Sequence, residues 1–165
     1  MAQKPDNIAG IIDDIRRVFQ VVHEQSRKAE QATGLTSPQL WAIKTIAQES
    51  PIMVSDIARR MYLHPATIVG ILDRLEKQNL VIRIRSIDDR RIVRVELTAT
   101  GRTLLKKAPE VAQNLLVEGL EKLPQRNLNK IASSMNQIVR ILGAQDKPAH
   151  LILSPEVNWP RNKKS

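Results

Sequence analysis

The chain has 165 residues, enough for one hydrophobic core, so the expected organisation is a single domain over residues 1–165. Its 26 lysines and arginines against 17 acidic residues give a formal charge of +9, which is typical of a protein with a polyanionic partner, either nucleic acid or an anionic membrane surface. On charge alone, a protein that is merely basic is an equally good interpretation. No cysteine occurs, which excludes disulfides, thiolate metal sites and thiol redox switches.

Several functional classes are disfavoured by what the sequence lacks. No apolar signal region and no membrane-spanning run of about 18 apolar residues is present, so we expect a cytoplasmic protein without membrane partners. Aromatic residues make up only 2%, which argues against stacking on single strands and favours duplex DNA. No phosphate loop or catalytic grouping occurs, and His23, His64 and His150 lack ligand spacing. We therefore predict no enzyme, no catalytic residue, no cofactor and no metal site.

The N-terminal third predicts two helices. Residues 1–7 form a polar leader, and apolar residues then recur at helical spacing from Ile8 to Val22, in a helix that Gly34 ends. In the next helix we place Ser37 as N-cap and Pro38 at the first helical position. Trp41, in this helix, is expected to lie in the hydrophobic core of the protein, and the alternative is that it lines a pocket.

A helix-turn-helix follows in residues 54–77. Residues 52–54 are a short apolar bridge that can form a brief strand, and Ser55 then caps the first helix. Residues 62–64 form the turn, and the second helix begins at Pro65, whose missing N–H costs nothing there. Its expected buried face is Ile68, Ile71, Leu72 and Leu75. Its expected outer face is Ala66, Gly70, Asp73 and Lys77, flanked by Thr67 and Arg74.

Two arginine-rich strands come next. Asn79 can adopt the left-handed conformation that reverses the chain. Residues 80–85 and 91–97 alternate like strands, with Leu80, Ile82 and Ile84 on the apolar face of the first, and residues 86–90 form the turn. Because five arginines and only two aspartates lie between positions 83 and 94, the pattern predicts a two-stranded ribbon with a cationic tip.

The C-terminal part predicts more helices. Thr98 looks like the N-cap of a helix over residues 99–107, Pro109 should break it locally, and Pro124 starts a last helix that Gly143 caps. The apolar stripes of the first and last helices have no sheet to cover, which favours a homodimer. The predicted dimerisation residues are Ile8, Ile11, Ile12, Ile15, Leu128, Ile131, Met135, Ile138 and Leu142.

Residues 144–165 form a separate tail. Leu151, Leu153 and Trp159 make it too apolar for a simple linker, so an arm lying across the dimer is one interpretation. A tail without fixed structure is the other.

The helix-turn-helix and the cationic ribbon together make a coherent reader of DNA. The second helix fits the major groove, and Arg90 at the ribbon tip would enter the adjacent minor groove, oriented by Asp88. Helix starts at Ser37 and Ser55 offer phosphate sites. The predicted DNA-binding residues are Ser37, Ser55, Pro65, Ala66, Thr67, Gly70, Arg74, Arg85, Asp88, Arg90 and Arg91.

These segments closely resemble the MarR family of bacterial transcription regulators. The similarity covers about residues 35–105, and its most specific part combines residues 88–91 (Asp-Asp-Arg-Arg) with residues 97–101 (Leu-Thr-Ala-Thr-Gly). It implies a mainly α fold with a small β-wing (α+β): a winged helix-turn-helix lobe at 35–105, flanked by dimerisation helices at 8–34 and 108–143, with the tail at 144–165. It also implies an obligate homodimer on pseudo-palindromic operators, mostly as a repressor, often released by a small aromatic or anionic effector.

Some positions depart from that family's pattern. Asn79 stands where glycine is usual, and Val69 and Gly70 stand where base-reading polar residues are frequent, so specificity should rest more on Thr67, Arg74, the wing and DNA shape. The missing cysteines exclude the peroxide-sensing branch, and the few histidines count against the zinc-sensing one.

An effector, if one exists, would lie between the dimerisation and DNA-binding regions. The candidate pocket residues are Ile15, Phe19, Trp41 and Met53. Two other functions stay open: a ligand-insensitive, nonspecific DNA-binding protein and a winged-helix protein-interaction module. The operator, the regulated genes and the effector are not predictable from the sequence.

Overall fold

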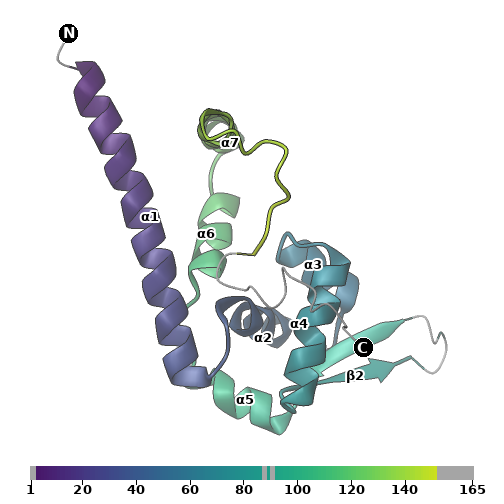
Figure 1. The fold of residues 1–165 in the computed structure, drawn as a ribbon. Coiled ribbons are helices and arrows are strands. Elements are labelled where there is room, and N and C mark those ends of the chain that lie inside the picture. The colour runs from purple at the N-terminus through teal and green to yellow at the C-terminus, as the bar shows by residue number, and fades with distance from the viewer. Residues whose placement is uncertain (1–2, 87–88, 90–91, 152–165) are drawn as a thin grey trace, which may run out of the picture.

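The protein was analysed as a computed structural model that describes residues 3–86, 89 and 92–151. In this part of the chain the elements are α1 (Gln3–Thr33), α2 (Ser37–Gln48), β1 (Ile52–Met53), α3 (Val54–Arg60), α4 (Pro65–Lys77), β2 (Val81–Arg85), β3 (Val93–Leu97), α5 (Ala99–Leu105), α6 (Ala112–Glu121) and α7 (Gln125–Ile141). The predicted fold class, mainly helical with a small antiparallel sheet, is confirmed (Figure 1). No helix among the described residues is long and apolar enough to cross a membrane.

Helix α1 starts earlier than predicted. The polar leader is wrong, because α1 begins at Gln3 and includes Pro5 within its first turn, where a missing backbone N–H breaks no helical hydrogen bond. Gly34 ends the helix as predicted, with a φ of +70° and its N–H donating to the Glu30 carbonyl at 2.8 Å. The N-terminal half of α1 extends away from the rest of the chain (Figure 1). Ala29, near the C-terminal end, is the only buried residue of α1.

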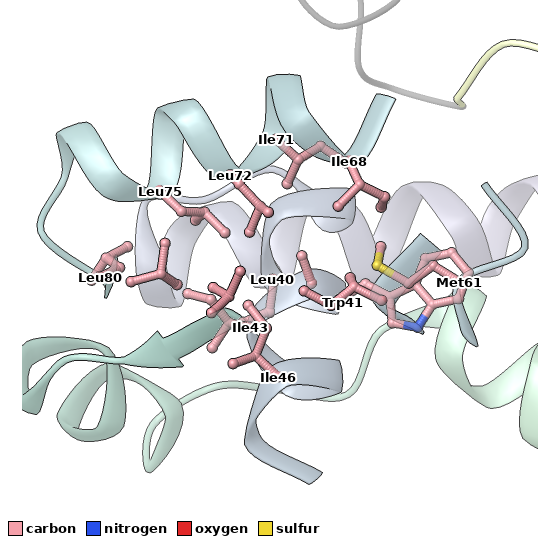
Figure 2. Close-up of a cluster of buried hydrophobic side chains, with 14 of the residues drawn as sticks. Leu40, Trp41, Ile43, Ile46, Met61, Ile68, Ile71, Leu72, Leu75 and Leu80 are labelled. Carbon is pink, nitrogen blue, oxygen red and sulfur yellow. The ribbon is translucent and has the colours of Figure 1, made fainter. Parts of the chain in front are cut away.

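The core lies between α2 and α4. Figure 2 shows side chains of α4 directed toward side chains of α2, and the predicted buried face of α4 is confirmed, because its four residues are all fully buried. Trp41 is also buried, which confirms its place in the core. Packing on α2 therefore leaves only the opposite face of α4 for contact with another molecule.

Two helix caps differ from the prediction. Thr36, not Ser37, is the N-cap of α2: the Thr36 backbone N–H donates to Gln39 Oε1 at 3.0 Å, which is one arm of a capping box, and Pro38 lies one position further into the helix. Met53, not Ser55, precedes α3, and no side chain caps that helix. Short runs of Ser, Thr and Pro allow several cap registers, and the glutamine three residues after Thr36 is the signal that selects this one.

The sheet has the order β1-β3-β2, with Val81 opposite Leu97 and Arg83 opposite Val95. Residues 52–53 do form a strand, as the apolar bridge suggested, and pair with β3. The predicted faces of β2 are reversed: Val81 is buried, whereas Ile82 and Ile84 are each 42% exposed. The alternation was real, but it was assigned to the wrong side of the sheet.

The reversal between α4 and β2 follows the prediction. Asn79 has a φ of +56°, and the Leu80 N–H donates to the Leu75 carbonyl at 2.9 Å. Thr98 caps α5 as predicted, since its Oγ1 accepts from the Gly101 N–H at 3.0 Å. The same hydroxyl donates to the Asn79 carbonyl at 2.7 Å, so one side chain joins the start of α5 to the end of α4.

The C-terminal helices are separate elements. Helix α5 ends at Leu105 and α6 begins at Ala112, so the helix stops before Pro109, where only a kink or local break was predicted. Pro124 precedes α7, and Gly143 ends it with a φ of +62°. Leu151 packs against the core of its own chain, and Leu153 and Trp159 lie outside the described residues, so the arm across a dimer stays a prediction.

Candidate nucleic-acid interface

Helix α4 begins with a side-chain cap that the sequence reading missed. His64 precedes Pro65, and its Nδ1 accepts a hydrogen bond from the backbone N–H of Ala66 at 3.2 Å. Because Nδ1 accepts this hydrogen bond, Nε2 is the ring nitrogen left to donate. His64 is exposed. A His-Pro pair at the start of a helix was the signal that could have identified this residue.

The outward face of α4 carries small side chains and few polar groups at its N-terminal end. Ala66 is exposed, Thr67 and Gly70 are half-buried, and a Cβ added at Gly70 would meet no atom within 4 Å. Val69, which was not among the predicted contacts, is 44% exposed on this face. The charged residues Asp73 and Lys77 come later in the helix and are exposed.

Arg83 fastens the ribbon to α4. Arg83 lies on the same face of β2 as the buried Val81, and its side chain is 23% exposed. Its guanidinium contacts Asp73 Oδ1 and Glu76 Oε2, each at 2.7 Å. The guanidinium also donates to the Val69 carbonyl at 3.2 Å. One of the five arginines that suggested a cationic ribbon therefore holds two protein elements together, and this role was not foreseen from the sequence.

Replacing Arg83 by methionine should weaken this junction. Arg83→Met keeps an unbranched apolar stem but removes the guanidinium, which leaves Asp73 and Glu76 without their cation. We therefore expect the free energy of unfolding to fall by about 1 kcal/mol, a value limited by solvent screening of the partly exposed carboxylates. Urea unfolding measures it. Arg94→Met is the matched control, because Arg94 is exposed on the opposite face of the sheet and pairs with Ile84. Equal losses in both variants would contradict the role given to Arg83.

The turn before α4 is tied to the C-terminal half of the chain. Tyr62 has a φ of +52° and is exposed, and its hydroxyl donates to Glu121 Oε1 in α6 at 3.0 Å. This hydrogen bond, together with the carboxylate charge, raises the pKa of the Tyr62 hydroxyl. The contact joins the helix-turn-helix directly to α6.

The structure places the predicted DNA-contacting residues unevenly. Ser37 is buried and donates to Gln113 Oε1 at 3.0 Å, so it has no surface for a phosphate, and we withdraw it. Pro65, Ala66, Thr67 and Gly70 lie together on the first turns of α4, and Arg74 is half-buried further along. Ser55 and Arg85 are exposed elsewhere. Asp88, Arg90 and Arg91 lie outside the described residues.

The four candidate effector residues do not form one pocket. Trp41 is buried in the core, Phe19 is exposed on α1, and Ile15 and Met53 are half-buried on separate elements. A surface pocket of about 510 Å³ opens instead between α1 and α5, lined by Ala32, Thr33, Ala99, Thr100, Thr103, Leu104 and Lys107. These residues were chosen as large apolar side chains by type, and contact of any of them with an effector stays a prediction.

The arrangement of α3, α4 and the β2–β3 ribbon is that of a winged helix-turn-helix protein. Residues 35–93 match the MarR family, and two regulators of Bacillus subtilis strain 168 are each 30% identical to the chain. The alignment with the organic hydroperoxide resistance transcriptional regulator covers 66% of this chain and 73% of that regulator. The alignment with the transcriptional repressor MdtR covers 53% of this chain and 56% of MdtR. The crystal structure of the transcriptional regulator BldR from Sulfolobus solfataricus superposes with a TM-score of 0.53 at 28% identity, covering 84% of this chain and 99% of BldR. The chain belongs to the MarR family and is a DNA-binding transcription regulator.

Proposed function

We propose that this regulator is a homodimeric repressor that binds a pseudo-palindromic operator with one α4 in each half-site. The observation that carries the proposal is the exposed, small-residue face of α4 beside an arginine-rich ribbon. A face of this kind lets the helix backbone come close to base edges in the major groove, while the ribbon lies over the phosphates and the next minor groove. The formal charge of +9 adds attraction that does not depend on base sequence.

A homodimer is supported by apolar residues that the single chain leaves uncovered. Ile8, Ile11 and Ile12 on α1 and Ile131 and Met135 on α7 are all exposed, and no residue of α7 is buried. A two-fold axis would set two α4 helices about one turn of DNA apart, roughly 34 Å. Repression follows if such an operator overlaps a promoter, and the name of the relative MdtR, a transcriptional repressor, supports that direction. The protein would work in the cytoplasm, beside the DNA.

Release by a small effector is a further part of the proposal. A ligand that prefers a dimer with the wrong spacing between its α4 helices would shift the population away from DNA. The hydrogen bond between Tyr62 and Glu121 supports such coupling, since it joins the turn before α4 to α6. The pocket between α1 and α5 offers a place for a small molecule beside Lys107.

Footprinting on the DNA around the protein's own gene tests the proposal. We expect protection of two half-sites about one helical turn apart at physiological salt, and loss of that protection with an effector found among small aromatic acids. Equal affinity for random DNA would instead identify a nonspecific DNA-binding protein. Absence of DNA binding would favour a protein-interaction module.

Removing Arg90 should weaken DNA binding through charge. This prediction rests on the sequence pattern alone, because Arg90 lies outside the described residues. Arg90→Ala should raise Kd several-fold and lower the slope of log K against log salt by about one for each protomer bound. Fluorescence anisotropy between about 50 and 200 mM salt, a range over which log K falls linearly with log salt, measures both.

The matched control is Arg17→Ala, which removes the same charge from an exposed position of α1. It should leave the salt slope almost unchanged. A slope in Arg90→Ala equal to that of the control would contradict a phosphate or minor-groove role for Arg90.

A further inference from the structure

The first two turns of α4 lack the side chains that usually identify bases. Residues 65–72 are Pro, Ala, Thr, Ile, Val, Gly, Ile and Leu, and Thr67 carries the only polar side chain among them. Arginine, lysine, asparagine and glutamine, which form the paired hydrogen bonds that distinguish guanine and adenine, are absent from this stretch. The surface that remains consists of the methyl groups of Ala66, Val69 and Thr67 around the open space at Gly70.

Neighbouring charged residues do not supply the missing contacts. The guanidinium of Arg83 is held against Asp73, Glu76 and the Val69 carbonyl, so it is turned toward the protein. Arg74 and Lys77 lie one to two turns further along α4, where a helix that enters the groove by its N-terminus approaches the phosphates. At the start of the helix, His64 presents a single N–H, which suits one phosphate or one purine nitrogen but not a paired contact.

We infer that α4 reads its operator chiefly through the C5-methyl groups of thymine, with Val69 as the main specificity-determining residue. The inference deepens the proposed function and rests on it, because it requires α4 in the major groove. Thymine is the one base that places an apolar group at the edge of that groove. Val69 is 44% exposed, and Gly70 beside it has no Cβ to hold the helix away from the DNA. Each half-site should therefore have thymines, on either strand, under the first two turns of α4.

Replacing thymine by deoxyuridine tests this reading directly. Deoxyuridine removes the C5-methyl group and keeps every hydrogen-bonding atom of the base. Starting from the footprinted operator, each thymine in the protected half-sites is replaced in turn, and Kd is measured by fluorescence anisotropy. We expect each contacted methyl to contribute roughly fourfold in Kd, the value for burying one methyl-sized group, and substitutions in the flanking DNA to have no effect.

A variant of Val69 links the effect to that residue. Val69→Ala should weaken binding to the thymine operator and shrink the penalty for deoxyuridine at one position in each half-site. Val21→Ala is the matched control, because Val21 is 50% exposed on α1 and loses the same two methyl groups. It should leave both the affinity and the deoxyuridine penalty as they are in the unchanged protein.

The outcomes separate this inference from the proposed function. No preference for the operator over random DNA would overturn the proposed function itself. Specific binding that deoxyuridine leaves unchanged at every position would overturn the methyl reading alone. A deoxyuridine penalty that is equally large at every position in Val69→Ala would overturn the role of Val69 and assign the effect to Ala66, Thr67 or DNA deformability.

Discussion

Gly101→Ala is expected to lower the free energy of unfolding by about 2–3 kcal/mol, the cost of overpacking a tight contact. In a chain of this size the melting temperature should fall by roughly 5–10 °C. A Cβ on Gly101 would lie 2.1 Å from the Leu80 carbonyl oxygen and 3.1 Å from its carbon, and both are backbone atoms. The Leu80 carbonyl also accepts from the Thr98 N–H at 3.1 Å, so the two segments cannot separate without losing that hydrogen bond. Calorimetry or thermal circular dichroism measures the change.

Gly119→Ala is the matched control for Gly101→Ala. Gly119 lies in helix α6, and a Cβ there would meet no atom within 4 Å. Alanine should stabilise that helix by up to about 1 kcal/mol through its higher helix propensity. Gly101→Ala that melts with the unchanged protein would show that the contact at Leu80 does not require glycine.

The Leu-Thr-x-x-Gly pattern illustrates what a sequence motif can predict. From the sequence, residues 97–101 supported a family resemblance and a cap at Thr98. The reason for glycine at position 101 appears only when the end of α4 and the start of α5 are placed together, because the obstructing atom belongs to Leu80. The local sequence pattern identifies Thr98 as a helix cap, whereas the requirement for glycine at position 101 comes from a contact between segments distant in the chain.

The buried face of an element was predictable from the sequence where the element was long enough for its apolar residues to repeat several times. The apolar residues of α4 repeat over thirteen residues, and their shared direction followed from that spacing. Strand β2 has only five residues, with branched apolar side chains on both faces, so alternation alone could not identify the buried side. Pairing with β3 decides it, since Val81 lies opposite the buried Leu97.

The candidate interface was predicted in position but not in detail. Ala66, Thr67 and Gly70 do lie on the outer face of α4, as helical spacing required. Arg83 was counted with the cationic ribbon, yet its partners Asp73 and Glu76 come from the preceding helix, a pairing that no spacing rule specifies. Ser37 was chosen as a helix start, but the packing of α6 on α2 buries it. Long-range partners decide which charged and polar side chains remain available to DNA.

Ile11→Glu is expected to convert the proposed dimer to a monomer. Ile11 is 51% exposed on α1 and belongs to the predicted dimerisation stripe. Because a two-fold interface contains the substitution twice, burial would have to desolvate two new carboxylates, which are not paired with any introduced cation. Light scattering should give half the mass of the unchanged protein. Affinity for the full operator should fall by at least about 100-fold, since the two half-sites would no longer be bound by linked modules.

Val21→Glu separates loss of the dimer from a general effect of a new charge on α1. Val21 is 50% exposed and lies on the side of α1 opposite the stripe, so this variant should remain dimeric and bind the operator as before. DNA with a single half-site separates the same two effects in a second way. Ile11→Glu should bind this DNA with the affinity of one protomer of the unchanged protein. A dimer that persists in Ile11→Glu would move the interface away from the α1 stripe. Monomers with undiminished operator affinity would show that dimerisation does not contribute to DNA recognition.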